Sequence, residues 1–176
     1  MLSASQLTGL RALVVDDLRE MRAMLRKTLS DAQIRDVVLV PDARAAVDAI
    51  RAAPFNLILA DHDLGPGTDG QQLLEYLRRE RLMPPGGLYF IISADSTIDR
   101  VASAAEMLPD GYLIKPVNTD QLLSRVEDAI ARQAELRPMY EAVHARRWTD
   151  GLAHCARFAQ AGTKHRMEVL RHQAIC

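Results

Sequence analysis

Five polar residues that can take part in metal or phosphate chemistry each follow a short apolar run. They are Asp16, Asp17, Asp61, Ser93 and Lys115. Three carboxylates held together repel one another, and a divalent cation relieves that repulsion. Oxygen ligands without a histidine or cysteine cluster favour Mg²⁺, so we expect a magnesium site. Beside such an ion Asp61 can attack a phosphoryl group, while Lys115 and Ser93 can pair with its oxygens.

The apolar runs before these residues have the length and composition of buried strands. We predict strands over residues 10–15, 37–40, 55–60, 88–93 and 112–114. Amphipathic stretches alternate with them and predict helices over 18–30, from Asp42, over 71–81, near 97–105 and from Asn118. This alternation indicates an α/β fold with a doubly wound, five-stranded parallel sheet. Ligands bind such sheets beyond the carboxyl ends of the strands, which is where the five polar residues fall.

The charge of the chain changes near residue 135. Residues 1–134 carry 15 Lys/Arg and 19 Asp/Glu, a net charge of −4, whereas residues 135–176 carry 7 and 4, a net charge of +3. We therefore predict a sheet domain over 10–134 and an all-α extension over 135–176. Residues 147–152 are weakly similar to the turn of a tetratricopeptide hairpin, although one such unit cannot bury a core. We expect Trp148 to be an anchor of this extension, either in its core, which is the favoured position, or at an interface.

Several other classes of protein are excluded or disfavoured by composition. No run approaches the roughly 18 apolar residues that cross a bilayer, and the first ten residues lack the pattern of a signal peptide, so we expect a cytoplasmic protein without membrane insertion. Two cysteines, Cys155 and Cys176, indicate neither a disulfide framework nor a zinc ribbon. A helical extension of 42 residues is too short for a DNA-binding output domain, so no direct DNA binding is expected.

The sequence resembles the receiver domain of bacterial two-component response regulators. The resemblance covers about residues 10–134 and is carried by VVDD at 14–17, LILADHDL at 57–64, IISA at 91–94 and YLIKP at 112–116. It implies a flavodoxin-like fold, known from the chemotaxis protein CheY, and a phosphoacceptor signalling protein rather than an enzyme. The implied donor is a sensor histidine kinase or a phosphotransfer protein, and the implied output is contact with a downstream protein or a homodimer.

The same resemblance assigns a role to each motif residue. Asp61 is the implied phosphoacceptor, Asp16 and Asp17 are the acidic Mg²⁺ pair, Ser93 is the switch hydroxyl and Lys115 is the phosphate-pairing lysine. Two further roles come from the resemblance alone. Tyr112 matches the aromatic switch position, and the backbone carbonyl of Asp63 matches the third protein contact to the metal.

The loop after Asp61 departs from the family pattern. Gly65 stands where a proline is usual, and the pair Asp69-Gly70 comes about one residue late. Two carboxylates, Asp63 and Asp95, occupy positions at which the family tunes the lifetime of the phosphoryl group. We expect their charge to change how water or a phosphatase reaches that group.

Two alternatives to the phosphoacceptor hypothesis remain open. One is a receiver-like scaffold that never takes phosphate. The other is a haloacid-dehalogenase-like phosphatase, because Asp61, His62 and Asp63 match the DxD motif of that family. The phosphatase family carries DxD on its first strand and a threonine soon after, whereas here two strand–helix units precede it and Thr68 is distant. That order makes the phosphatase the weaker alternative.

Overall fold

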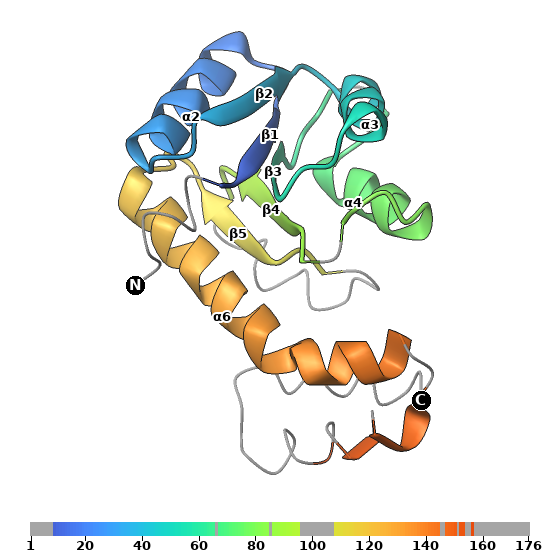
Figure 1. The fold of residues 1–176 in the computed structure, drawn as a ribbon. Coiled ribbons are helices and arrows are strands. Elements are labelled where there is room, and N and C mark those ends of the chain that lie inside the picture. Colours follow the sequence, from blue (N-terminus) through green and yellow to red (C-terminus); the bar gives the residue numbers. More distant parts are fainter. Residues whose placement is uncertain are drawn as a thin grey trace. The chain divides into compact units, whose positions relative to one another are not determined.

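A computed structural model of the chain describes residues 9–65, 67–84, 86–95, 108–144, 147–150, 152–153 and 156 (Figure 1). The predicted helix near 97–105 lies outside the described residues.

The five predicted strands form one parallel sheet, so the predicted fold class is confirmed. The strands are β1 (Arg11–Val15), β2 (Asp36–Val40), β3 (Leu57–Asp61), β4 (Leu88–Ser93) and β5 (Gly111–Ile114). Their spatial order is β2-β1-β3-β4-β5. Since β1, β3 and β4 are almost entirely buried, they carry apolar side chains toward both faces, as expected of a parallel sheet covered on both sides.

Three helices and the first turns of a fourth flank the sheet in the described part of the chain. They are α2 (Arg19–Asp31), α3 (Ala43–Ala52), α4 (Gly70–Arg79) and α6 (Thr119–His144). Figure 1 shows α2 and the start of α6 on one face of the sheet and α3 and α4 on the other. Each of α3 and α4 begins at an aspartate whose carboxylate accepts a backbone N–H of the first turn, Asp42 from Ala45 and Asp69 from Gln72.

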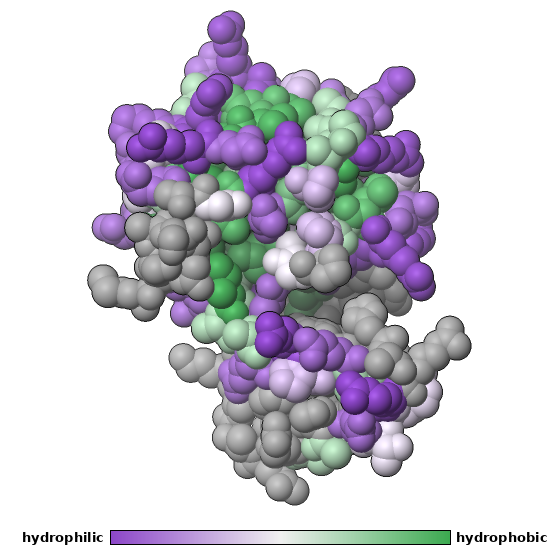
Figure 2. All heavy atoms as spheres, in the orientation of Figure 1, coloured by the Kyte–Doolittle hydropathy of each residue, from purple (hydrophilic) through white to green (hydrophobic). Residues whose placement is uncertain are grey.

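The core on the α3 and α4 face is one continuous apolar cluster. Alternate strand residues point into it, as the two-residue period of a strand requires. From the strands it takes Leu13, Val15, Val40, Ile58, Ala60, Tyr89, Ile91 and Tyr112, and from the helices Ala46, Ile50, Leu73, Leu74 and Leu77. On the visible surface the described residues are mostly hydrophilic, with apolar patches between the charged side chains (Figure 2). The packing holds the strand ends, and hence the polar residues beyond them, in fixed positions.

The chain divides into two compact units, Met1–Ala129 and Ile130–Cys176. The predicted domain boundary near residue 135 stays a prediction. Helix α6 continues through Pro138, so this proline does not end the helix, although its ring removes one backbone donor. Trp148 is 41% exposed, so its prediction as a core residue is wrong, and its alternative role as an interface anchor stays a prediction. Within the described residues, no helix is long and apolar enough to span a bilayer.

Candidate acidic site at the carboxyl ends of the strands

Three carboxylates converge where β1 and β3 end. Asp16 and Asp17 follow β1, and Asp61 is the last residue of β3. One oxygen of each lies within 4.8 Å of the others. Asp16 is fully buried and Asp61 is 7% exposed, while Asp17 is exposed. The parallel pairing of β1 with β3 brings these residues together, because both strands end at the same edge of the sheet.

Asp16 is held in place by the start of α2. Its Oδ1 accepts the backbone N–H of Leu18 at 2.9 Å, and its backbone carbonyl accepts from the guanidinium of Arg22 at 2.6 Å. Burial raises the pKa of the Asp16 carboxyl above its ordinary value, even though the Leu18 N–H and the Lys115 ammonium favour the charged form. A buried carboxylate that is costly to charge is well suited to a cation.

Lys115 places an ammonium group between two of the carboxylates. Its Nζ lies 2.7 Å from Oδ2 of Asp61 and 3.4 Å from Oδ2 of Asp16. Burial alone would lower the pKa of Lys115, but the hydrogen bond and negative charge of Asp61 help to outweigh it and raise that pKa. Its backbone N–H donates to the carbonyl of Ser93, and its peptide bond with Pro116 is cis. Lys115 is therefore a fixed positive charge at the Asp61 carboxylate.

Ser93 lies on β4, the strand next to the one that carries Asp61, and Tyr112 lies on β5, one strand further away. Ser93 ends β4, one residue beyond the partner of Asp61 in the parallel register, and is 4% exposed. Its Oγ accepts the backbone N–H of Asp95 at 3.0 Å, which leaves the hydroxyl hydrogen able to donate. Tyr112 lies in β5, is 7% exposed and belongs to the apolar cluster. The aromatic side chain is therefore packed inside the domain.

The carboxylate of Asp63 is not part of the acidic cluster. It is exposed and accepts the backbone N–H of Gly65 at 3.1 Å. Asp63 also forms an antiparallel bridge with Asp69, which closes the loop between them. Gly65 takes a left-handed backbone conformation with φ of 87°, as glycine does readily. The altered loop is thus closed at its base, and the Asp69 cap still starts α4 beside β3.

Gly70 joins α4 directly to the strand that carries Asp61. A Cβ atom on Gly70 would lie 2.4 Å from the backbone carbonyl oxygen of Asp61, so no other residue fits without displacement. Its N–H donates to the carbonyl of His62 at 2.9 Å, and its carbonyl accepts from the buried hydroxyl of Tyr89 at 2.8 Å. Sequence reasoning noted Gly70 only as part of the Asp69-Gly70 pair, and it missed the contact of Gly70 with Asp61 and the role of Tyr89. The capping-box spacing from Asp69 to Gln72 was the available signal for this helix start.

The fold, and the acidic residues at the carboxyl edge of the sheet, agree with the family that the sequence matches. The family model for the response regulator receiver domain matches residues 12–127. The chain belongs to the response regulator receiver family. Its fold is also that of the chemotaxis response regulator CheY4 of Vibrio cholerae, with a TM-score of 0.59 at 23% identity over 68% of this chain and 98% of that one.

Two curated relatives show how the receiver domain is used elsewhere. The transcriptional regulatory protein TcrA of Mycobacterium tuberculosis is 31% identical over 134 residues, which are 76% of this chain and 51% of TcrA. This chain thus spans about half the length of that relative. The chemotaxis protein CheY of Pseudomonas aeruginosa is 27% identical over 70% of this chain and 98% of its own length. Residues 12–127 are therefore the receiver domain of a two-component response regulator, a class phosphorylated on aspartate.

Proposed function

We propose that Asp61 accepts a phosphoryl group from a phosphohistidine of a sensor histidine kinase or of a phosphotransfer protein. The observation that carries the proposal is the convergence of Asp16, Asp17 and Asp61 with the ammonium of Lys115 at 2.7 Å from Asp61. Parallel sheets bind ligands at this edge, and an aspartate there is a suitable nucleophile for phosphoryl transfer. The proposal also places the protein in the cytoplasm, where such a donor acts.

The transfer exchanges one bond to phosphorus for another. A carboxylate oxygen of Asp61 forms a bond to phosphorus while the bond from phosphorus to the histidine nitrogen breaks, and that nitrogen keeps the electron pair. The negative charge of the carboxylate passes to the imidazole ring that keeps this electron pair, and a proton from solvent neutralises the ring, while the phosphoryl oxygens keep the charge they had. Lys115 is fixed where those oxygens arrive, and the Ser93 hydroxyl supplies a neutral donor from the neighbouring strand. Catalysis here consists of positioning and charge stabilisation.

The carboxylates are a fitting ligand set for Mg²⁺. Their oxygens are hard donors within 4.8 Å of one another, and two of the three side chains are buried. Asp16, Asp17 and Asp61 would hold the ion, with the backbone carbonyl of Asp63 as a further contact. When bound, the ion neutralises charge on the transferring phosphoryl group. We propose Mg²⁺ as the only cofactor.

We further propose that Ser93 and Tyr112 form the conformational switch. The side chain of Tyr112 is packed inside the domain. In the proposed switch, contact between the Ser93 hydroxyl and the phosphoryl group stabilises this buried position of Tyr112. Tyr112→Ala removes the side chain, and we expect it to abolish any phosphorylation-dependent change in partner binding. Unchanged dependence in that variant would remove Tyr112 from the mechanism.

The proposed output is contact with a downstream protein. TcrA is named a transcriptional regulator and CheY a chemotaxis protein, so receiver domains like this one serve different outputs. Residues 130–176 form a separate compact unit, which we propose takes part in that contact or in pairing two copies of the chain. We propose no direct DNA binding by the chain.

The test uses beryllofluoride, which mimics an aspartyl phosphate, together with Mg²⁺. Binding by calorimetry and molar mass by light scattering are measured for the wild type, for Asp61→Asn and for the control Asp128→Asn, which removes an exposed carboxylate of α6. We expect saturable binding in the wild type and the control and none in Asp61→Asn. A change in mass on binding would locate the output in self-association.

Two results would favour the alternatives. Absence of binding in the wild type would contradict the phosphoacceptor proposal and favour a phosphate-independent scaffold. Steady multiple-turnover hydrolysis of a phosphomonoester, lost in Asp61→Asn, would favour the phosphatase instead.

A further inference from the structure

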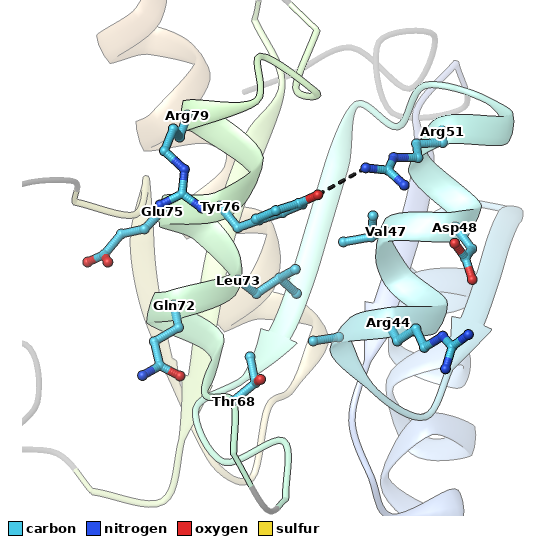
Figure 3. Close-up of a pocket in the computed structure, with 11 residues that line it drawn as sticks. Arg44, Val47, Asp48, Arg51, Thr68, Gln72, Leu73, Glu75, Tyr76 and Arg79 are labelled. Atoms are coloured by element: carbon cyan, nitrogen blue, oxygen red, sulfur yellow. Dashed lines mark hydrogen bonds between the residues drawn. The ribbon is translucent and has the colours of Figure 1, made fainter.

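A groove of about 740 Å³ runs between α3 and α4, on the face of the sheet away from α2 (Figure 3). Its floor is apolar and consists of Val47 from α3 with Leu73 and Tyr76 from α4. Val47 and Tyr76 are only partly buried, although both pack against the core cluster. Seven of the eleven lining residues are polar or charged, so the groove has a narrow apolar floor between polar walls.

One end of this groove is basic. The guanidinium of Arg51 donates to the Tyr76 hydroxyl at 2.9 Å, and the guanidinium of Arg79 lies 5.7 Å from the centre of the same ring. Both arginines are exposed, and among the described residues no carboxylate pairs with Arg51. Within the part of the chain that the structure describes, the carboxylate paired with Arg79 is that of the exposed Glu80, at 3.6 Å.

The acidic residues of the groove do not cancel this charge. Figure 3 shows Glu75 directed away from α3, on the outer side of α4, and its carboxylate accepts from Gln71. Asp48 lies on α3, on the far side of Val47 from Tyr76 (Figure 3). The tyrosine ring with its two arginines thus offers guanidinium donors next to an apolar surface, which suits a carboxylate beside an apolar side chain.

We propose that this groove docks an acidic amphipathic segment of a partner protein, and that Gly70 links its occupancy to the state of Asp61. The segment lays apolar side chains on the partly exposed Val47 and Tyr76, between which Leu73 is buried, and its carboxylates on Arg51 and Arg79. From Gln72 to Arg79 the wall is about 10 Å long at 1.5 Å per residue, which matches two turns of a docked helix.

The link to Asp61 follows from how α4 begins. Gly70 is the first residue of α4, and its backbone packs against the carbonyl of Asp61 with no room for a side chain. The hydroxyl of Tyr89, which lies on β4, holds the same residue by donating to its carbonyl. A shift of the Asp61 backbone therefore moves the wall of the groove that carries Leu73 and Tyr76. This linkage rests on the proposed function, whereas the docking itself does not.

The docking test measures the anisotropy of a labelled, alanine-based helical peptide of about 14 residues, with two leucines one turn apart and glutamates beside them. A second peptide has glutamine in place of every glutamate. The proteins are the wild type, the double variant Arg51→Glu/Arg79→Glu, and the control Arg26→Glu/Arg35→Glu, which makes the same charge change at exposed positions outside the groove.

We expect the acidic peptide to bind the wild type and the control, and to lose about tenfold or more in affinity with the groove variant, as charge-assisted hydrogen bonds predict. Equal binding of the glutamine peptide would overturn the acidic chemistry. Saturable binding of inorganic phosphate without any peptide binding would make the groove a small-anion site and overturn the partner segment.

The linkage is tested by repeating the titration with Mg²⁺ and beryllofluoride. We expect the peptide affinity of the wild type to change by about fivefold, and the change to shrink in Tyr89→Phe, which releases Gly70 but leaves the groove residues in place. An unchanged affinity while beryllofluoride binds at Asp61 would overturn the linkage alone. Peptide binding with no beryllofluoride binding would overturn the proposed function and the linkage together, and leave the docking standing.

Discussion

Removing the buried hydroxyl of Tyr89 gives a quantitative test of the joint between β3 and α4, by which we mean the contact of Gly70 with the backbone carbonyl of Asp61. Tyr89 is fully buried, and its hydroxyl donates to the Gly70 carbonyl at 2.8 Å. Burial raises the pKa of Tyr89 far above its ordinary value, so the hydroxyl is a donor throughout the neutral range. Tyr89→Phe keeps the ring and removes only this hydrogen bond. Tyr76→Phe is the matched control, because its hydroxyl bonds to the exposed Arg51.

The expected loss follows from the surroundings of each hydroxyl. A buried hydrogen bond contributes about 0.5–1.5 kcal/mol, and an acceptor left without its partner adds a desolvation cost. In Tyr89→Phe the Gly70 carbonyl loses the hydroxyl but remains an acceptor in the first turn of α4. We therefore expect the free energy of unfolding to fall by about 1–2 kcal/mol. For a unit of this size that is a fall in Tm of roughly 4–7 °C. Tyr76→Phe should cost less than about 0.5 kcal/mol, because water replaces its partner.

Urea denaturation followed by circular dichroism measures both variants. The shift in the midpoint, at an unchanged slope, gives the difference in unfolding free energy. If Tyr89→Phe were no more destabilising than Tyr76→Phe, the hydroxyl would not hold Gly70 and the joint would lose its physical basis.

Three further predictions concern the acidic site. Gly70→Ala places a methyl group against the Asp61 carbonyl, and we expect calorimetry to show about 1–3 kcal/mol of destabilisation together with weaker Mg²⁺ binding; normal Mg²⁺ affinity would contradict the contact. Burial raises the pKa of Asp16, which means that the folded state disfavours its charged form, and Asp16→Asn removes that charge. We therefore expect the variant to have a higher Tm than the wild type in chelator and a smaller rise in Tm on adding Mg²⁺. A lower Tm in chelator would count against this reasoning. Replacing Asp63 and Asp95 together by asparagine should change the dephosphorylation rate measured with a phosphorylated sample, and an unchanged rate would exclude them from tuning.

The strands and the acidic cluster could be predicted because each depends on local sequence. Runs such as 57–60 and 88–92 consist of apolar and aromatic residues, which is typical of a short strand covered on both faces. Once the strands are parallel, Asp16 and Asp61 must lie at the same edge of the sheet, whatever the conformation of the loops that follow them. The start of β3 was placed too early, at Phe55, since this residue is buried in the core but lies before the paired region.

Other features depend on contacts that no local pattern encodes. The bond from Tyr89 to Gly70 requires the register of β4 on β3 and the side-chain conformation of a residue that looks like any core aromatic. The α3 and α4 groove depends on how two helices pack, and its arginines look like an ordinary solvated face in the sequence. The spacing of Trp148 on an apolar helical stripe predicts that it packs, but spacing does not say whether a neighbouring element of the chain covers it, and it is 41% exposed.

The bridge between Asp63 and Asp69 closes the base of the loop that precedes Gly70. The position of Gly70 therefore does not depend on how many residues the loop contains. Gly65 and Gly67, inside the closed loop, have left-handed backbone conformations with open space around the position of a Cβ atom. Residues can thus be added or removed between the two aspartates while α4 keeps its joint to β3. For protein engineering, this loop is the place to graft a fluorescent reporter a few residues from Asp61, where it would follow events at the acidic site without entering the core.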